Sequence, residues 1–127
     1  MFLLDASALL AMLLNEPGGN FVWDNLGGSE ISAINLSEVY AVLFNGGMSA
    51  ERAGEVVLST RIRIRNFGDE HARETARLRR LTKPYGLSLG DRACLAQAGF
   101  SQLPILTSDR RMAAASDTVG LDIRLIR

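Results

Sequence analysis

The chain has 127 residues, which suits one domain that buries roughly two-thirds of the surface exposed by its unfolded form. Its 14 basic and 14 acidic residues give a net charge of zero, so nothing suggests long-range attraction to nucleic acid, and a nucleic-acid substrate would need local basic groups or a bound cation. The single cysteine, Cys94, excludes an internal disulfide framework, and the single histidine, His71, argues against a His-rich zinc site or a Ser-His-Asp triad. We therefore expect one domain spanning residues 1–127.

The apolar N-terminus resembles a signal peptide only superficially. It has no basic leading region, it contains Asp5, and it is too short to span a bilayer. We therefore expect a cytoplasmic protein with no membrane association, which agrees with the reducing compartment that a lone cysteine suggests.

The first half of the chain alternates short apolar runs with helical patterns. The predicted elements are a strand at 2–5, helices at 6–14 and 21–26, a strand at 30–32, and helices at 33–45 and 49–58. The helix at 33–45 has the clearest pattern, because its apolar residues recur at the spacing of one helical face. Ser49 is placed to cap the helix that follows.

The second half continues this alternation. The predicted elements are a strand at 61–65, a helix at 69–81, a turn at 83–86, a helix at 89–98, a strand at 104–107, a helix at 109–115 and a strand at 122–126. The strand at 61–65 alternates arginine with isoleucine, so one face is expected to be apolar and the other to carry arginine. Strands that alternate with helices indicate an α/β fold, with a mostly parallel sheet covered on both faces.

Four carboxylates stand in distinctive places, and each has an ordinary structural explanation. Asp5 and Asp109 follow buried apolar runs and would serve as N-caps of the next helices. Asp91 lies three residues after Ser88, which fits a capping box. Glu38 lies roughly opposite the main apolar side of its helix, which by itself suggests a solvated position.

Taken together, the same four acids indicate a metal site. Ligands of open α/β sheets bind beyond the carboxyl ends of the strands, where Asp5 and Asp109 are expected. Two carboxylates about 5 Å apart repel by roughly 3 kcal/mol at an effective dielectric constant of about 20, so four that converge would rival the total stability of a domain. Such a cluster must bind protons or a cation, and a site made only of oxygen ligands selects Mg²⁺ or Mn²⁺.

Four segments of the chain resemble PIN-domain ribonucleases, in particular the VapC-type toxins of bacterial toxin–antitoxin pairs. The matching runs follow the order and spacing of the family and are LLDASALLA (3–11), ISAINLSEVYAVL (31–43), LSLGDRACLA (87–96) and PILTSDRRM (104–112). LSLGDRACLA is the most specific of them, and the similarity covers essentially the whole chain. The resemblance implies a three-layer α/β/α sandwich with a parallel sheet of about five strands.

The resemblance also implies a site, an activity and partners. The residues that it implicates are the acids Asp5, Glu38, Asp91 and Asp109 and the polar residues Thr107 and Ser7. Asp5 and Asp91 would be the leading metal ligands, and the other two acids would complete the site directly or through water. The implied reaction is site-specific cleavage of RNA, often tRNA or ribosomal RNA, by a water that Mg²⁺ or Mn²⁺ activates. The implied partners are a second copy of the chain and a VapB-type antitoxin whose C-terminal segment occupies the active-site groove.

Two groups of arginine residues each permit two interpretations. Arg92, Arg110 and Arg111 are next to the acids in sequence and are candidates for contacts with substrate or antitoxin, with solvation on a helix surface as the alternative. The three arginines of the strand at 61–65 would contact RNA phosphates or protect a sheet edge by their charge, and we favour the second interpretation.

The aromatic and sulfur-containing residues give weaker indications. Phe21 and Trp23 lie in the early helical region, where the family often packs its antitoxin, and ordinary core packing explains them equally well. Cys94 is expected to be a small core residue, and His71 is expected at the surface.

Three other functions compete with a ribonuclease. A non-catalytic partner of an antitoxin or corepressor would have no reason to keep four mutually repelling acids. A phosphatase of the haloacid-dehalogenase type also begins with an aspartate at a strand end, but it needs a second acid two residues later, where this chain has Ser7. A DNA-directed nuclease would share the metal chemistry, so that alternative stays open.

Overall fold

Five parallel strands form the centre of the computed structural model, which describes residues 1–127. The strands are β1 (Leu3–Leu4), β2 (Glu30–Ser32), β3 (Arg63–Arg65), β4 (Ile105–Thr107) and β5 (Ile123–Leu125). They are arranged in the order β3-β2-β1-β4-β5, and every neighbouring pair is parallel. The predicted parallel sheet of about five strands is therefore confirmed.

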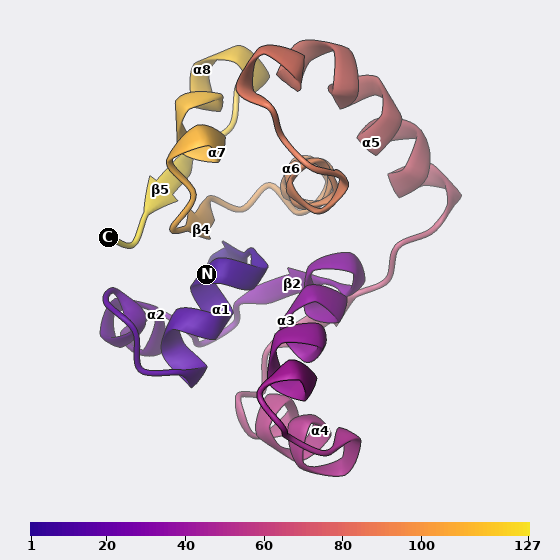
Figure 1. Cartoon of the computed structure of the whole chain (residues 1–127). Coiled ribbons are helices and arrows are strands. Elements are labelled where there is room, and N and C mark those ends of the chain that lie inside the picture. Colours follow the sequence, from indigo (N-terminus) through magenta and orange to yellow (C-terminus); the bar gives the residue numbers. More distant parts are fainter.

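Helices cover both faces of this sheet. They are α1 (Ala6–Leu13), α2 (Gly19–Asp24), α3 (Ala33–Asn45), α4 (Ala50–Ser59), α5 (Asp69–Thr82), α6 (Leu89–Ser101), α7 (Arg110–Ala114), α8 (Ser116–Val119) and the 3₁₀ helix η1 (Lys83–Tyr85). Helices α1 to α4 lie on one side of the sheet, and α6 lies on the other side with α5 outside it (Figure 1). The three-layer α/β/α prediction is thus confirmed. None of the helices combines the length and the apolar character that crossing a membrane requires.

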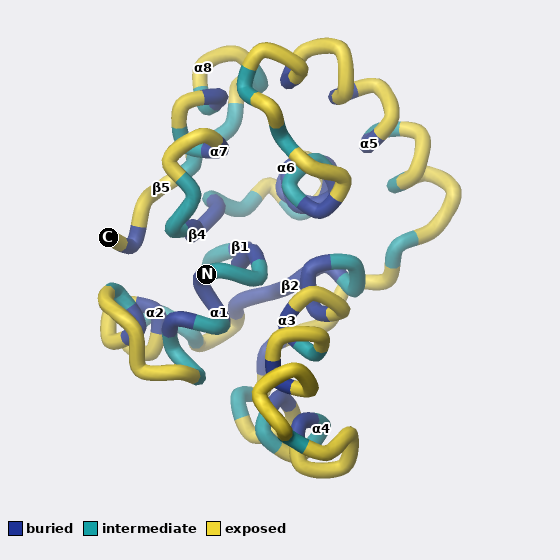
Figure 2. The backbone as a smooth tube through the Cα atoms, in the orientation of Figure 1, coloured by how far each residue is buried: buried dark blue, intermediate teal, exposed yellow.

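Alternating side chains of the central strands build a core on each side of the sheet. Leu4, Ile31 and Leu106 pack into the cluster beneath α1 and α3, whereas Leu3 and Ile105 pack into the cluster beneath α6. All five side chains are fully buried, and Figure 2 shows buried segments in the central strands, such as β2 and β4, and in α6. These short strands are therefore fixed by packing on both faces, which is typical of parallel sheets.

Several details differ from the predictions. Helix α6 continues through Gly99 to Ser101, and it ends only where Gln102 adopts a left-handed conformation with φ of 52° and donates its N–H to the carbonyl of Ala98. Helix α8 was not expected. Cys94 is buried as predicted, whereas His71 is half-buried between the rings of two phenylalanines instead of lying free at the surface.

The arginine-rich strand is shorter and more exposed than predicted. β3 begins only at Arg63, because Arg61 takes a left-handed conformation with φ of 57°. Every residue of β3 is exposed, so the side that carries Ile64 is not a buried apolar face. β3 lies at the edge of the sheet. Its charges therefore fit the edge-protection interpretation.

Candidate functional site

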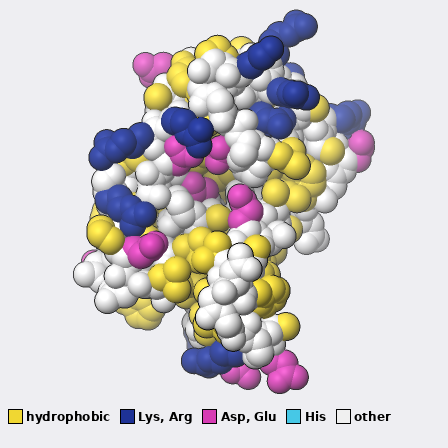
Figure 3. Space-filling view, in the orientation of Figure 1, with side chains coloured by type: hydrophobic (Ala, Val, Ile, Leu, Met, Phe, Trp, Pro, Cys, Tyr) yellow, Lys and Arg dark blue, Asp and Glu magenta, His cyan; other side chains and the backbone are white.

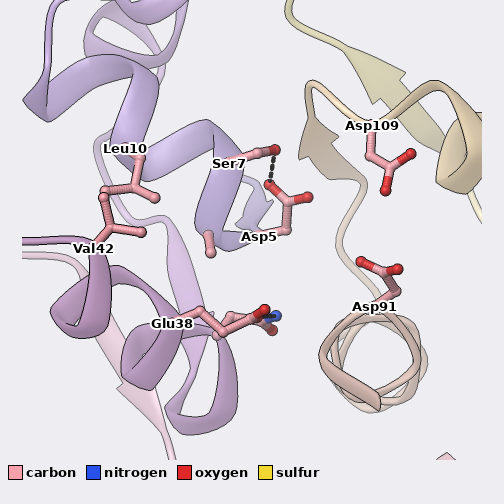
Figure 4. A pocket seen from close by; sticks show the side chains of 9 residues that line it. Asp5, Ser7, Leu10, Glu38, Val42, Asp91 and Asp109 are labelled. Carbon is pink, nitrogen blue, oxygen red and sulfur yellow. Dashed lines mark hydrogen bonds between the residues drawn. The ribbon is translucent and has the colours of Figure 1, made fainter. Parts of the chain in front are cut away.

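The fold brings the four predicted acids to one end of the sheet. Asp5 follows the central strand β1, Asp109 follows β4, Glu38 lies on α3 after β2, and Asp91 lies in the first turn of α6. All four line a single pocket of about 250 Å³ at the carboxyl end of the strands. Figure 4 shows their carboxylates directed toward one shared space, and Figure 3 shows acidic side chains in the middle of this face with basic ones around them.

Asp5 is the most deeply placed of these acids, with 5% of its surface exposed. Its Oδ1 accepts hydrogen bonds from the Ser7 hydroxyl at 2.7 Å and the Ala8 N–H at 2.9 Å, and its Oδ2 accepts one from the Thr107 hydroxyl at 2.5 Å. The N-cap prediction is confirmed, because the Ala8 bond closes the first turn of α1. Asp5 is therefore both a helix cap and a wall of the pocket.

Burial also changes the acidity of Asp5. Burial is the main cause that raises the pKa of Asp5 from 3.8 to about 6, and the charge of Asp91 acts in the same direction. The three hydrogen bonds to Asp5 lower the pKa by a smaller amount. A carboxylate that is buried near another acid in this way gains from a cation in the pocket.

Ser7 and Thr107 join the ends of β1 and β4 around Asp5. The Ser7 hydroxyl lies 3.4 Å from that of Thr107 and accepts the N–H of Ser108 at 2.9 Å. The Thr107 hydroxyl accepts the N–H of Asp109 at 2.9 Å. The two polar residues that the sequence singles out are therefore adjacent, and they fix the carboxylate of Asp5 relative to the loop that carries Asp109.

Glu38 is held by a contact between α3 and α6 that the sequence analysis missed. Asn35, which is 1% exposed, donates from Nδ2 to Glu38 Oε1 at 2.9 Å and to the Gly90 carbonyl at 3.0 Å. A Cβ atom at Gly90 would lie 2.5 Å from Glu38 Oε1, so only glycine permits this approach. The sequence does contain a signal that could have indicated this contact. Asn35 comes one turn before Glu38, and Gly90 comes directly before Asp91.

Asp91 and Asp109 also confirm their predicted capping roles. Asp91 Oδ2 accepts the N–H of Ser88 at 2.9 Å, while the Asp91 N–H donates to the Ser88 hydroxyl at 3.2 Å, which completes the capping box of α6. Asp109 Oδ1 accepts the N–H groups of Arg111 and Met112 at the start of α7. Capping and pocket lining thus coexist in the same three aspartates.

The pocket suits a hard divalent cation by the chemistry of its donors. Its four ionisable residues all offer carboxylate oxygens. No three acids, histidines or cysteines converge closely enough to form a ready-made ligand cluster. Mg²⁺ is often bound through one or two carboxylates and several waters, so a pocket with spread carboxylates agrees with that ion better than with a cation that needs a full protein cage.

The predicted arginines occupy different positions around this pocket. Arg111 Nε lies 3.7 Å from Asp109 Oδ1, and Arg110 is exposed. Arg92 lies outside the acidic pocket, because its Nη1 donates to the Thr75 carbonyl at 3.1 Å. Only Arg111 is therefore paired with one of the four acids.

Cys94 lies behind the acids and has no exposed surface. Burial raises the pKa of Cys94 well above its ordinary value, and the charges of Asp5, Asp91 and Glu38 act in the same direction. The thiol therefore stays neutral and serves as packing, as the sequence predicts.

Known proteins share both the sequence pattern and the fold. The family model described as PIN domain matches residues 2–117, whereas no curated protein sequence matches the chain. A toxin–antitoxin complex from Klebsiella pneumoniae is similar with a TM-score of 0.77 and 21% identity, over 100% of this chain and 98% of the other. DNA-bound VapBC from Salmonella typhimurium gives a TM-score of 0.72 and 20% identity, over 99% and 98% of the two chains. VapBC2 from Rickettsia felis, bound to a DNA fragment from its promoter, gives a TM-score of 0.69 and 14% identity, over 98% of this chain and 97% of the other. These TM-scores show a shared fold, and the family match over nearly the whole length means that the chain belongs to the PIN domain family.

Proposed function

We propose that the chain is a metal-dependent, site-specific endoribonuclease and the VapC-type toxin of a toxin–antitoxin pair, which inhibits translation by cutting RNA. The observation that carries this proposal is the convergence of Asp5, Glu38, Asp91 and Asp109 on one pocket from four separate parts of the sequence. PIN-domain proteins are generally nucleases that use divalent metal ions, and the similar solved structures include toxin–antitoxin complexes.

In this proposal the acids hold Mg²⁺ or Mn²⁺, with Asp5 and Asp91 as the leading ligands and Glu38 and Asp109 acting directly or through water. The bound metal would activate a water for attack on the phosphodiester and offset charge on the phosphoryl oxygens. Because metal ligands must be deprotonated, Asp5 would hold the metal as a carboxylate. A filled site would keep Asp5 deprotonated even somewhat below its metal-free pKa of about 6.

The remaining residues of the pocket would act by positioning. The hydroxyls of Ser7 and Thr107 restrict the rotation of the Asp5 carboxylate, since each donates to a different oxygen. Asn35 restricts Glu38 in the same way. Such pre-orientation lowers the reorganisation needed when metal and substrate bind.

The proposed partners are RNA, a second copy of the chain in a homodimer, and a VapB-type antitoxin, all in the cytoplasm. Phe21 and Trp23 on α2 are 46% and 67% exposed, so the core-packing interpretation of these residues is wrong. Two aromatic side chains exposed on one short helix favour burial against a partner, and we assign the antitoxin to this surface.

In-vitro cleavage of total cellular RNA with end-mapping tests the proposed activity. Wild type and Asp5→Asn are compared in Mg²⁺, in Mn²⁺ and in EDTA. We expect discrete cuts by the wild type that need metal and disappear in the variant. Equal, metal-independent background from both proteins would leave the non-catalytic antitoxin or corepressor partner as the better description, and cleavage of DNA alone would favour a DNA-directed nuclease.

A further inference from the structure

A second pocket, of about 300 Å³, lies where the end of α5, η1 and the start of α6 meet. Its lining includes three cations, Arg79, Lys83 and Arg92, and no carboxylate. The whole chain has equal numbers of acidic and basic residues, so this concentration of positive charge is local. We call it the basic pocket.

The charges of the basic pocket are not neutralised within the protein. None of its three cations forms an ion pair, although eight ion pairs involve other residues of the chain. Arg92 donates one hydrogen bond from Nη1 to the Thr75 carbonyl, and its buried Nε–H has no partner. Three cations that share a recess without a counter-charge favour an anion that accepts several hydrogen bonds at once.

The basic pocket is connected to the acidic one by two contacts. Ser88, which lines the basic pocket, donates its N–H to Asp91 Oδ2 at 2.9 Å. The second contact is made by Arg111. Its Nη1 lies close to Gly86 of the basic pocket, 3.8 Å from where a Cβ atom would be, and its Nε lies 3.7 Å from Asp109 Oδ1 of the acidic pocket. Cations therefore extend from the rim of the acidic pocket into the basic one.

We propose that the basic pocket binds a backbone phosphate of the RNA strand next to the bond that is cut, which rests on the proposed function. A strand that enters the acidic pocket carries further phosphates on either side of the reacting one, and four carboxylates repel them. Arg79, Lys83 and Arg92 offset that repulsion at one neighbouring phosphate. A phosphate contact of this kind fixes the position of the strand without selecting its sequence.

Binding of a fluorescein-labelled, mixed-sequence single-stranded RNA in EDTA tests the proposal without cleavage. Arg79→Gln/Lys83→Gln is compared with Arg80→Gln, which removes an exposed arginine of the same helix from outside the pocket. We expect the double variant to bind roughly tenfold more weakly. For the double variant, the slope of the logarithm of the RNA-binding constant against the logarithm of salt concentration should be smaller in magnitude by about 0.7, because one phosphate contact is lost. Arg80→Gln should match the wild type.

The outcomes separate this proposal from the proposed function. If the double variant and Arg80→Gln bind RNA equally, the pocket does not hold a phosphate, even if the wild type cuts RNA. If only the double variant binds weakly while the wild type never cuts in Mg²⁺ or Mn²⁺, the pocket is supported and the nuclease proposal is wrong. A double variant that binds RNA normally but loses an acidic protein partner would also overturn the phosphate assignment.

Discussion

Asp5 stabilises the fold through its hydrogen bonds and destabilises it through its charge. It caps α1 and receives two side-chain hydroxyls, yet it is almost fully buried near Asp91. Asparagine could supply much of the same capping, so the proposed metal site is what accounts for a charged group in this position.

The raised pKa of Asp5 predicts a distinct pH dependence of stability. The folded-state pKa of about 6 exceeds the ordinary 3.8, so the folded protein binds more protons than the unfolded chain between these values. The contribution of Asp5 to the free energy of unfolding therefore falls as pH rises from about 4 to about 6. Above that range the metal-free protein carries the full penalty, about 3 kcal/mol at most.

Asp5→Asn removes this titration, so it should be more stable than the wild type above pH 6 in EDTA. The gain should shrink toward pH 4. Urea denaturation at pH 4, 5, 6 and 7.5 measures the difference between the two proteins. Asp69→Asn serves as the control, because Asp69 on α5 is 82% exposed and its ion pair with Arg73 is solvated; the pH dependence of its stability should follow that of the wild type. An Asp5→Asn protein that is less stable than the wild type at every pH would contradict the electrostatic penalty.

A second prediction concerns Gly90, where adding a single methyl group should displace Glu38. In Gly90→Ala the new methyl group would lie 2.5 Å from Glu38 Oε1, so we expect Glu38 to leave the pocket and cleavage to fall at least tenfold. Gly99→Ala in the same helix has nothing within 4 Å of the new atom and should keep full activity, with about 0.5–1 kcal/mol more stability. Cleavage rates and melting temperatures of both variants measure this. Equal activity in the two would show that Glu38 does not need its present position.

The sequence was sufficient to find the acids but not the residues that position Glu38. Asp5, Asp91 and Asp109 follow recognisable strand and helix boundaries, so local chemistry and strand order place them together. Asn35 and Gly90 are 55 positions apart and act only through the packing of α3 on α6. No local pattern specifies that contact, and neither residue is acidic.

At the scale of elements, the edge strand β3 is tied to its neighbour by charge. Arg63 and Arg65 place Nη1 atoms 3.6 and 3.7 Å from Oε2 of Glu30, a residue of β2 that is 6% exposed. Ser101 donates to the other oxygen of Glu30 at 2.7 Å. The alternating sequence predicted the strand and its edge position, but it gave no sign of this buried acid.

Arg63→Gln/Arg65→Gln should therefore destabilise the protein by about 1–2 kcal/mol, since the Glu30 charge loses both cations. Arg52→Gln breaks the solvated ion pair with Glu55 on α4 and should cost no more than about 0.5 kcal/mol. Chemical denaturation at pH 7 compares the two variants. RNA binding should be unchanged in both, so a loss of RNA affinity in the β3 variant would revive the phosphate-contact interpretation of that strand.

The starts of helices that a side chain caps were predicted well, whereas the end of α6 was not. Ser49 and Ser88 start α4 and α6 as expected, because each hydroxyl accepts a backbone N–H. The end of α6 was placed too early, since Gly99 remains helical and the chain turns only at Gln102. Packing along α6, most of which is buried, outweighs the weak helix propensity of glycine.

At the scale of the whole molecule, the exposed aromatic residues of α2 give a prediction about how an antitoxin would restrain the proposed activity. Phe21→Ser/Trp23→Ser should bind a VapB-type antitoxin at least about tenfold more weakly, because the two rings supply apolar area that a partner buries. The free protein should keep its rate of RNA cleavage, as neither residue lines the acidic pocket. Inhibition of cleavage by titrated antitoxin measures the affinity. Leu58→Ser, at a 79% exposed position on α4, is the control, and equal inhibition of both variants would exclude α2 as the docking surface.

For the proposed toxin, the order of the strands also bears on when the chain would begin to act in the cell that makes it. Synthesis completes Asp5 and Glu38 early, but Asp91 and Asp109 follow only after α5, and β4 must then insert beside β1. A nascent chain that has emerged only as far as α5 holds half of the carboxylates and lacks the Thr107 hydroxyl that orients Asp5. Under the proposed function, the polypeptide would thus be inert until the last third of the chain has left the exit tunnel and folded. That delay would leave time for the proposed antitoxin to bind it.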